Sequence, residues 1–201
     1  MLTYLPYALI YSRVLLALAI GWLAVNRAPQ STGWIIVLMV VGLLTDIFDG
    51  IIARNIGVST QRLRLLDSNV DQFFWLVTIG AIFYLNLSFV LDHWFWIAMV
   101  LLLEIGTYVV SYVRFSKPVA THTIMAKIWT LSLLAFLIDL QWNATSSLFF
   151  GLCIGLGILS RFEIMGILVR LTNWANDVPT IFSVKKINDG TPIKRNKFFN
   201  G

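Results

Sequence analysis

Long apolar runs, rather than alternating apolar and polar positions, dominate the chain. Each run is close to the ~20 residues that a helix needs to cross a bilayer. Short polar connections separate several of the runs, whose approximate bounds are 7–25, 33–54, 65–86, 90–113, 123–141 and 146–170. The pattern predicts an all-α integral membrane protein with six transmembrane helices.

The composition agrees with this class, since 58% of the 201 residues are hydrophobic and only 12% are charged. We expect one six-helix transmembrane domain over residues 1–171 and a basic cytoplasmic tail over residues 172–201. The tail is polar, so we expect an extended segment near the lipid head groups. The first run lacks the basic start and the cleavage site of a signal peptide, so it is expected to be retained as a span.

The basic residues predict the orientation of the spans. If the chain has six spans and its N-terminus lies inside the cell, fourteen of the fifteen basic residues fall on the cytoplasmic side of the membrane. Only Arg27 falls on the other side. The positive-inside rule then places both termini in the cytoplasm, in a membrane of the bacterial inner or plasma type. The net charge of +5 suits an anionic leaflet. No nucleic-acid module is evident, so membrane lipid is the expected partner.

A cluster of aspartates lies between the second and third runs, in the segment DIFDGIIARNIGVSTQRLRLLDSNVD at 46–71. On a helix, Gly50 and Ala53 fall within about 40° of Asp46, and Asp49 falls within about 60°. These residues form an acidic face with small neighbours that allow close approach of a ligand. In the third run, Asp67 and Asp71 are four residues apart and also share a face.

Four carboxylates at a membrane boundary repel one another and are costly to leave unpaired. Hard oxygen ligands without a histidine or cysteine cluster suit Mg²⁺ or Mn²⁺. The oxygens suffice for two ions, an arrangement that serves phosphoryl transfer. Arg54 lies on the same side and can hold phosphate with its forked guanidinium.

The aspartate segment resembles the motif of the CDP-alcohol phosphatidyltransferases, D-x2-D-G-x2-A-R-x8-G-x3-D-x3-D. Seven of the eight defining positions match at the right spacing, namely Asp46, Asp49, Gly50, Ala53, Arg54, Asp67 and Asp71. Leu63 stands where the family has glycine. Weaker similarities are LPYALIYSR, which ends at Arg13, and AKIWT, which contains Lys127 and Thr130. The family's six-helix architecture covers essentially the whole chain.

The resemblance implies transfer of a phosphatidyl group from CDP-diacylglycerol to the hydroxyl of a small polar acceptor, with release of CMP. It implies that Asp46, Asp49 and Asp67 bind the first of two Mg²⁺ or Mn²⁺ ions. Asp71 would help to hold the second ion and act as the catalytic base. The family also suggests a homodimer.

The resemblance further implies a site for the CDP donor and one for the acceptor. Gly50 and Ala53 would line the cytidine pocket, and Arg54 would bind the donor's diphosphate. The basic residues that could bind an acceptor phosphate, as of glycerol 3-phosphate or inositol phosphate, are Arg114, Lys117, Lys127 and Arg161. The alternative is that these charges only satisfy the positive-inside rule. Asp-Ser-x-x-Asp at 67–71 is also similar to serine-accepting members.

Leu63 leaves several interpretations open. In a helix it lies within about 40° of Asp67, where its side chain would obstruct a nucleotide. The third helix could instead begin later, the enzyme could hold its donor differently or use another CDP-linked donor, or the chain could be a pseudoenzyme.

Two other classes compete with a transferase. A divalent-cation transporter would place acids near the bilayer midplane in both halves of the chain, whereas these acids occupy one segment. A membrane scaffold would leave the acids unexplained.

Three charged residues lie inside predicted spans and need partners or a function. Arg13 could reach the donor head group or extend to the interface. Glu104 and Glu163 could be functional acids, or they could pair with an arginine such as Arg114 or Arg161 on a neighbouring helix.

Overall fold

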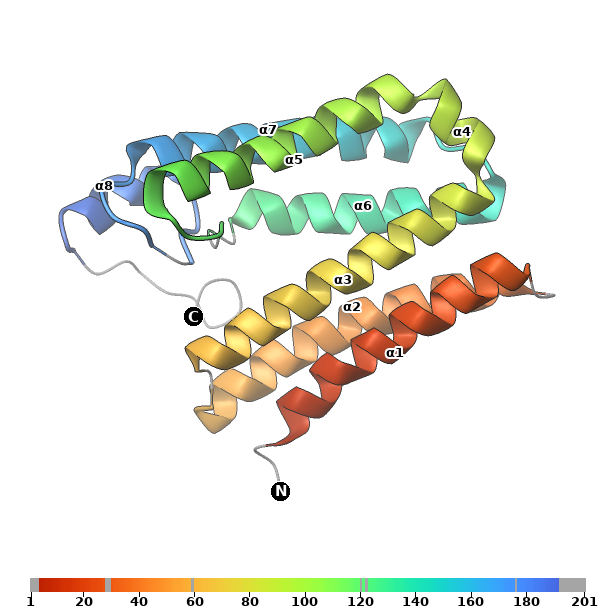
Figure 1. The fold of residues 1–201 in the computed structure, drawn as a ribbon, viewed down its shortest axis with the longest axis horizontal. Coiled ribbons are helices and arrows are strands. Elements are labelled where there is room, and N and C mark those ends of the chain that lie inside the picture. Colours follow the sequence, from red (N-terminus) through yellow and green to blue (C-terminus); the bar gives the residue numbers. More distant parts are fainter. Residues whose placement is uncertain are drawn as a thin grey trace. The chain divides into compact units, whose positions relative to one another are not determined.

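The computed structural model describes residues 4–27, 30–58, 60–119, 121, 123–175 and 177–191. Helices make up most of these ranges (Figure 1). The long helices are α1 (Leu5–Asn26), α2 (Ser31–Ile56), α3 (Gln61–Leu85), α5 (Trp94–Phe115), α6 (Ile124–Asn143) and α7 (Leu148–Arg170). The short elements are α4 (Leu87–Asp92), the 3-10 helix η2 (Ile181–Ser183) and α8 (Val184–Asn188). Each predicted apolar run thus corresponds to one long helix, and the all-α class is confirmed.

Among the described residues, five helices are long and apolar enough to cross a membrane: α1, α2, α5, α6 and α7. Helix α3 is not among them, because its first half carries polar side chains that include Asp67, Asn69 and Asp71. The sixth span and the cytoplasmic position of the termini stay predictions.

The chain divides into two compact units, residues 1–90 with 137–145 and residues 91–136 with 146–201. In the first unit, α1 packs against both α2 and α3 (Figure 1). Its buried residues recur every three or four positions: Pro6, Ile10, Arg13, Ala17, Ile20 and Ala24. This spacing makes one continuous stripe along the helix. Arg13 is the only charged residue in that stripe.

Close packing joins α2 to α3 in the same unit. Phe74 of α3 is fully buried, and its ring lies against Gly42 of α2. A Cβ atom at position 42 would lie 2.2 Å from Cζ of Phe74, so only glycine fits there. Gln141 of α6 adds a polar connection, because it accepts from Asn86 Nδ2 and donates to Thr32 Oγ1, each at 3.5 Å.

In the second unit, α5 packs along α7. Arg161 of α7 is buried and pairs with Glu104 of α5. Its guanidinium also lies over the ring of Trp129 on α6, 4.5 Å from the centroid. The expectation that Glu104 has an arginine partner on a neighbouring helix is confirmed. Glu163 instead accepts a hydrogen bond from the backbone N–H of Ile181.

The expectation of an extended tail is wrong for the described residues after α7. Val178 and Val184 are buried in a cluster with Ile167 and Leu171 at the end of α7. Asn188 of α8 holds this segment in place, since it donates to the carbonyl of Arg170 at 2.9 Å and accepts from Thr172 at 3.1 Å. Apolar residues spaced among polar ones therefore bring the segment back to the end of α7, and the overall polarity of the segment conceals them.

The contact between Gly42 and Phe74 predicts a stability difference between two glycine variants. Gly42→Ala forces the Phe74 ring or the α2 backbone to move, and overpacking of this kind costs about 1–3 kcal/mol. Gly80→Ala on α3 is the matched control, because nothing lies within 4 Å of its added Cβ. There, replacing a helical glycine should be neutral or stabilising. Thermal unfolding in detergent should show a lower midpoint for Gly42→Ala only, and equal midpoints would contradict the packing described.

Candidate metal centre and active site

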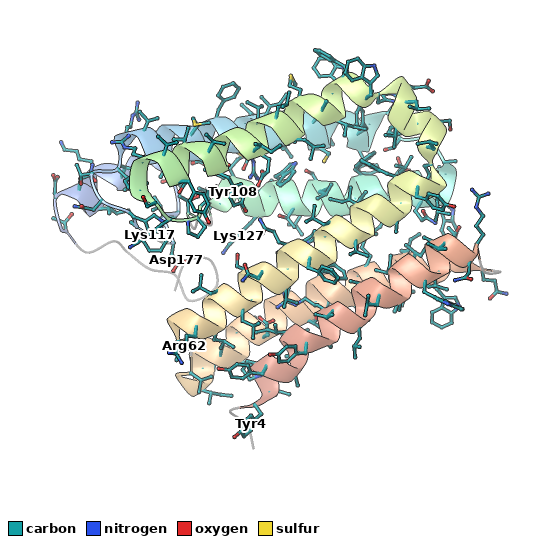
Figure 2. All side chains as sticks on the ribbon, in the orientation of Figure 1. Tyr4, Arg62, Tyr108, Lys117, Lys127 and Asp177 are labelled. Carbon is teal, nitrogen blue, oxygen red and sulfur yellow. The ribbon has the colours of Figure 1, made fainter. Side chains whose placement is uncertain are left out.

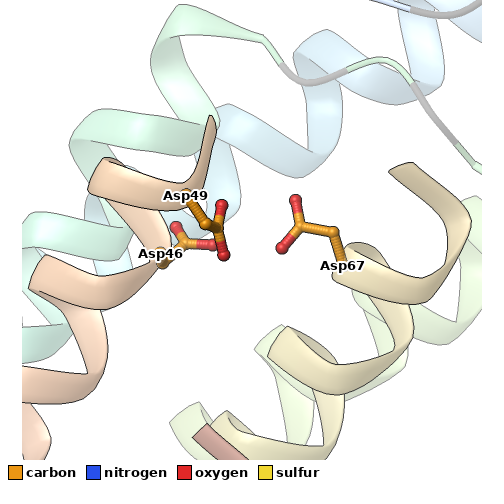
Figure 3. A group of neighbouring side chains, drawn as sticks. All are labelled: Asp46, Asp49 and Asp67. Atoms are coloured by element: carbon orange, nitrogen blue, oxygen red, sulfur yellow. The ribbon is translucent and has the colours of Figure 1, made fainter. Parts of the chain in front are cut away.

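The aspartates of the motif converge in the first unit from two neighbouring helices. Asp46 and Asp49 lie one turn apart on α2, and Asp67 faces them from α3 (Figure 3). One carboxylate oxygen of each of these three residues lies within 4.8 Å of the others. Asp49 is buried, while Asp46 and Asp67 are half-buried. The predicted ligands of the first ion therefore do come together.

Arg13 of α1 occupies the centre of this cluster. Its side chain is completely buried, and its Nη1 lies 2.6 Å from Asp46 and 3.5 Å from Asp71. Its Nη2 lies 2.5 Å from Asp49 and also pairs with Asp67. One guanidinium thus contacts all four carboxylates. Its Nε has no hydrogen-bond partner among the described residues.

Arg13 was not among the residues predicted to bind the metal, the donor's diphosphate or the acceptor. Its two expected roles, reaching the donor head group or extending to the interface, did not predict its contact with the four aspartates. The signal that could have found it is positional, because Arg13 falls on the same stripe as Ile10 and Ala17, which face the core. A buried charge on such a stripe needs an opposite charge on the facing helix.

The cluster has the chemistry of a divalent-ion site. Its donors are carboxylate oxygens, the ligands that Mg²⁺ and Mn²⁺ prefer. With all four carboxylates ionised, the one positive charge that Arg13 brings offsets only part of their negative charge, counting the side chains that the structure describes. The residues present therefore fit one or two divalent ions. Asp46, Asp49 and Asp67 would hold the first ion, and Asp71 is placed one helical turn further along α3.

The residues expected at the CDP donor lie beside these aspartates on α2. Gly50 is half-buried and follows Asp49 directly. Ala53 is buried at 5% exposure, in one cluster with Ile10, Leu63 and Val70. Arg54 belongs to α2, and its side chain lies outside the described part of the chain.

Leu63 has a defined place in the structure. Helix α3 begins before it, with Thr60 as the N-cap whose Oγ1 accepts from the N–H of Leu63 at 3.2 Å. The side chain of Leu63 is 4% exposed and shares a cluster with Ala53. The alternative of a later helix start is therefore wrong. A leucine occupies the space that the family's glycine would leave open next to Ala53.

The basic residues expected at the acceptor all belong to the second unit. Arg114 donates to the carbonyls of Val169 and Leu171, which satisfies the end of α7. Lys117 lies over the ring of Trp174, 4.7 Å from its centroid. Arg161 pairs with Glu104, as described above. Lys127 is exposed in the first turn of α6 (Figure 2).

An all-α membrane protein that gathers carboxylates from two adjacent helices is suited to metal-assisted phosphate chemistry. The chain matches the CDP-alcohol phosphatidyltransferase family over residues 3–174 and belongs to that family. It is therefore a phosphotransferase of phospholipid biosynthesis that transfers a substituted phosphoryl group from a CDP-alcohol. Neither a curated protein nor a solved structure matches the chain.

The position of Leu63 predicts opposite effects on stability and on donor binding. Leu63→Ala removes a buried side chain and should lower the free energy of unfolding by about 2–5 kcal/mol. It also opens the space beside Ala53, so the KM for the CDP donor should fall. Leu65→Ala is the matched control, since Leu65 is 50% exposed on the same helix. Thermal unfolding and donor titrations of CMP release would test both effects. An unchanged or raised KM in Leu63→Ala would show that Leu63 does not obstruct the donor.

Proposed function

We propose that this enzyme transfers a phosphatidyl group from CDP-diacylglycerol to the hydroxyl of a small polar acceptor and releases CMP. The observation that carries the proposal is the convergence of Asp46, Asp49 and Asp67, within 4.8 Å, in a chain of this family. Such a cluster suits two Mg²⁺ or Mn²⁺ ions, which when bound would stabilise the negative charge on the transferred phosphoryl group.

The proposed reaction is a direct displacement at phosphorus. The acceptor oxygen attacks the phosphorus that carries the diacylglycerol, and a new P–O bond forms. The bond from that phosphorus to the oxygen shared with CMP breaks, and CMP leaves with the bonding electrons. The acceptor's proton passes to a carboxylate, for which we propose Asp71.

Asp71 differs from the other three aspartates in a way that supports this role. Its oxygen is 3.5 Å from Arg13, whereas Asp46 and Asp49 lie at 2.6 and 2.5 Å. Its side chain is 35% exposed, which is similar to Asp46 and Asp67 and far above the 2% of Asp49. Asp71 is thus the carboxylate held least tightly by the guanidinium, and it is accessible enough to accept a proton from an arriving hydroxyl.

The donor would lie along α2. Gly50 and Ala53 present little side chain, which lets a nucleotide approach the helix closely. We assign the diphosphate to Arg54, because a guanidinium binds two phosphate oxygens at once and neutralises the leaving group. The diacylglycerol chains would remain in the bilayer.

For the acceptor, we propose an alcohol that carries a phosphate, such as glycerol 3-phosphate or inositol phosphate. The support is the positive charge of Arg114, Lys117, Lys127 and Arg161. Lys127 is the first of these to test, since its side chain is exposed. Arg161 would have to share its charge between the acceptor and Glu104. The distribution of basic residues supports an active site that faces the cytoplasm.

The assignment of Asp71 predicts a specific loss of activity. Asp71→Asn keeps the shape of the side chain but cannot accept the proton, and loss of a general base costs about 10²–10⁴-fold in rate. CMP release from CDP-diacylglycerol would be measured with Mg²⁺ or Mn²⁺ across glycerol 3-phosphate, inositol 1-phosphate, serine and choline. Chelation of the metal should abolish release in the wild type.

Two controls accompany this assay. Asp92→Asn alters an exposed aspartate at the end of α4 and should leave the rate unchanged. Asp49→Asn removes a buried member of the converging group and should weaken Mn²⁺ binding more than Asp71→Asn does. Acceptor-dependent release that survives in Asp71→Asn would refute the assigned base. No release with any acceptor would refute the proposed substrates.

A further inference from the structure

Arg13 and the proposed divalent ions require the same three carboxylates. The guanidinium contacts Asp46 Oδ1, Asp49 Oδ2 and Asp67 Oδ1. These three residues also make up the group that could ligate an ion. Mg²⁺ binds oxygen at about 2.0–2.1 Å. A guanidinium and an ion that share these three carboxylates would therefore lie within a few ångströms of each other and repel strongly.

The charge balance indicates that divalent ions displace Arg13 from the aspartates when metal is available. Within the described side chains, the charge of Arg13 balances only one of the four ionised carboxylates. Two divalent ions would neutralise all four carboxylates. Once they are bound, the charge of Arg13 has no partner left in the cluster, and an unpaired buried guanidinium is costly.

The unpaired Nε of Arg13 supplies an independent observation. This N–H is buried and has no acceptor among the described residues. The other residues of its helical stripe, such as Ile10 and Ala17, have no side-chain acceptor to offer. Arginine binds phosphate through a fork of neighbouring N–H groups. The guanidinium therefore retains donor capacity for an anion even while it holds the aspartates.

We propose that Arg13 holds the four aspartates in the metal-free enzyme and exchanges them for the donor's diphosphate when divalent ions bind. The step breaks no covalent bond, because Arg13 only changes its ionic partners. It makes Arg13 a donor-binding residue of the loaded enzyme and a competitor of the metal in the empty one. Donor and metal then favour each other's binding. The metal ions release Arg13 from the aspartates, and the donor's diphosphate pairs with the released guanidinium. The donor part rests on the proposed function, whereas the competition with metal does not.

Mn²⁺ affinity is the decisive measurement, and it requires no substrate. The full-length protein in detergent would be titrated with Mn²⁺, with the free ion followed by electron paramagnetic resonance. Removing the competing charge in Arg13→Gln should tighten Mn²⁺ binding by about tenfold or more. Metal-free Arg13→Gln should also unfold at a lower temperature than the wild type, and saturating Mn²⁺ should narrow that gap.

Two further variants make the test specific. Arg27→Gln removes the arginine at the C-cap of α1 and should leave Mn²⁺ affinity unchanged. The guanidinium carbon of Arg27 lies 5.9 Å from the ring centroid of Tyr84. Arg13→Lys covers the case in which Arg13→Gln does not fold. A lysine keeps the charge but lacks the fork that holds four carboxylates, so Mn²⁺ should displace it more easily than it displaces arginine.

The outcomes distinguish an Arg13 that competes with the metal from an Arg13 that supports metal binding. Weaker Mn²⁺ binding in the Arg13 variants would overturn the proposal, because Arg13 would then position the metal ligands. Unchanged binding would also overturn it, because Arg13 would then have no effect on the metal. For the donor, CDP binding to the Mn²⁺-saturated protein should weaken about tenfold in Arg13→Gln and stay unchanged in Arg27→Gln. Equal CDP affinity in both variants would overturn the donor part alone. Failure of every acceptor in the CMP assay would leave the Mn²⁺ result standing.

Discussion

The contact of one buried guanidinium with four carboxylates is the constraint on which the first unit depends. Neither partner is tolerable alone in an apolar bundle, because burying an unpaired charge costs several kcal/mol. Arg13 comes from α1, Asp46 and Asp49 from α2, and Asp67 and Asp71 from α3. The pairing therefore specifies that α1 lies against both other helices, and it fixes their register to within a turn. The apolar residues of the α1 stripe stabilise the arrangement without selecting one register so sharply.

Small residues then determine how closely these helices approach one another. Gly42 accepts the Phe74 ring where a Cβ would clash, and Ala17 and Ala24 of α1 are fully buried. Close approach brings the aspartates of two helices near enough to share one cation. Leu63 fills the space at the other edge of the site, because its side chain packs beside Ala53. The cluster of charges and the packing around it are therefore parts of one arrangement.

The sequence allowed the helices and the aspartate group to be predicted because both depend on local spacing. Apolar runs of helical length mark the long helices, and the short polar loop between the second and third runs places the acids at two adjoining helix ends. Arg13 was missed because its partners are 33 to 58 residues away, so the pairing depends on how helices pack and not on spacing. The direction in which the Leu63 side chain points depends on where α3 starts, and the N-cap residue Thr60 determines that start. The packing of Val178, Val184 and Ile187 at the end of α7 was hidden because these apolar residues are separated by polar ones, including Lys185 and Lys186, and show no continuous apolar run.

Charge balance distinguishes the aspartate cluster around Arg13 from the buried pair of Arg161 and Glu104. In the second unit, Arg161 and Glu104 are one cation and one anion, and Trp129 covers the guanidinium. The charges of such a pair cancel, so no ligand is needed to balance them. In the first unit, four acids contact one arginine among the side chains that the structure describes, so these five residues together carry excess negative charge. A protein retains such an imbalance only if something else supplies the missing positive charge, and for carboxylate oxygens that is a divalent cation. The imbalance itself, more than burial or clustering, is what marks the aspartates as the site of chemistry.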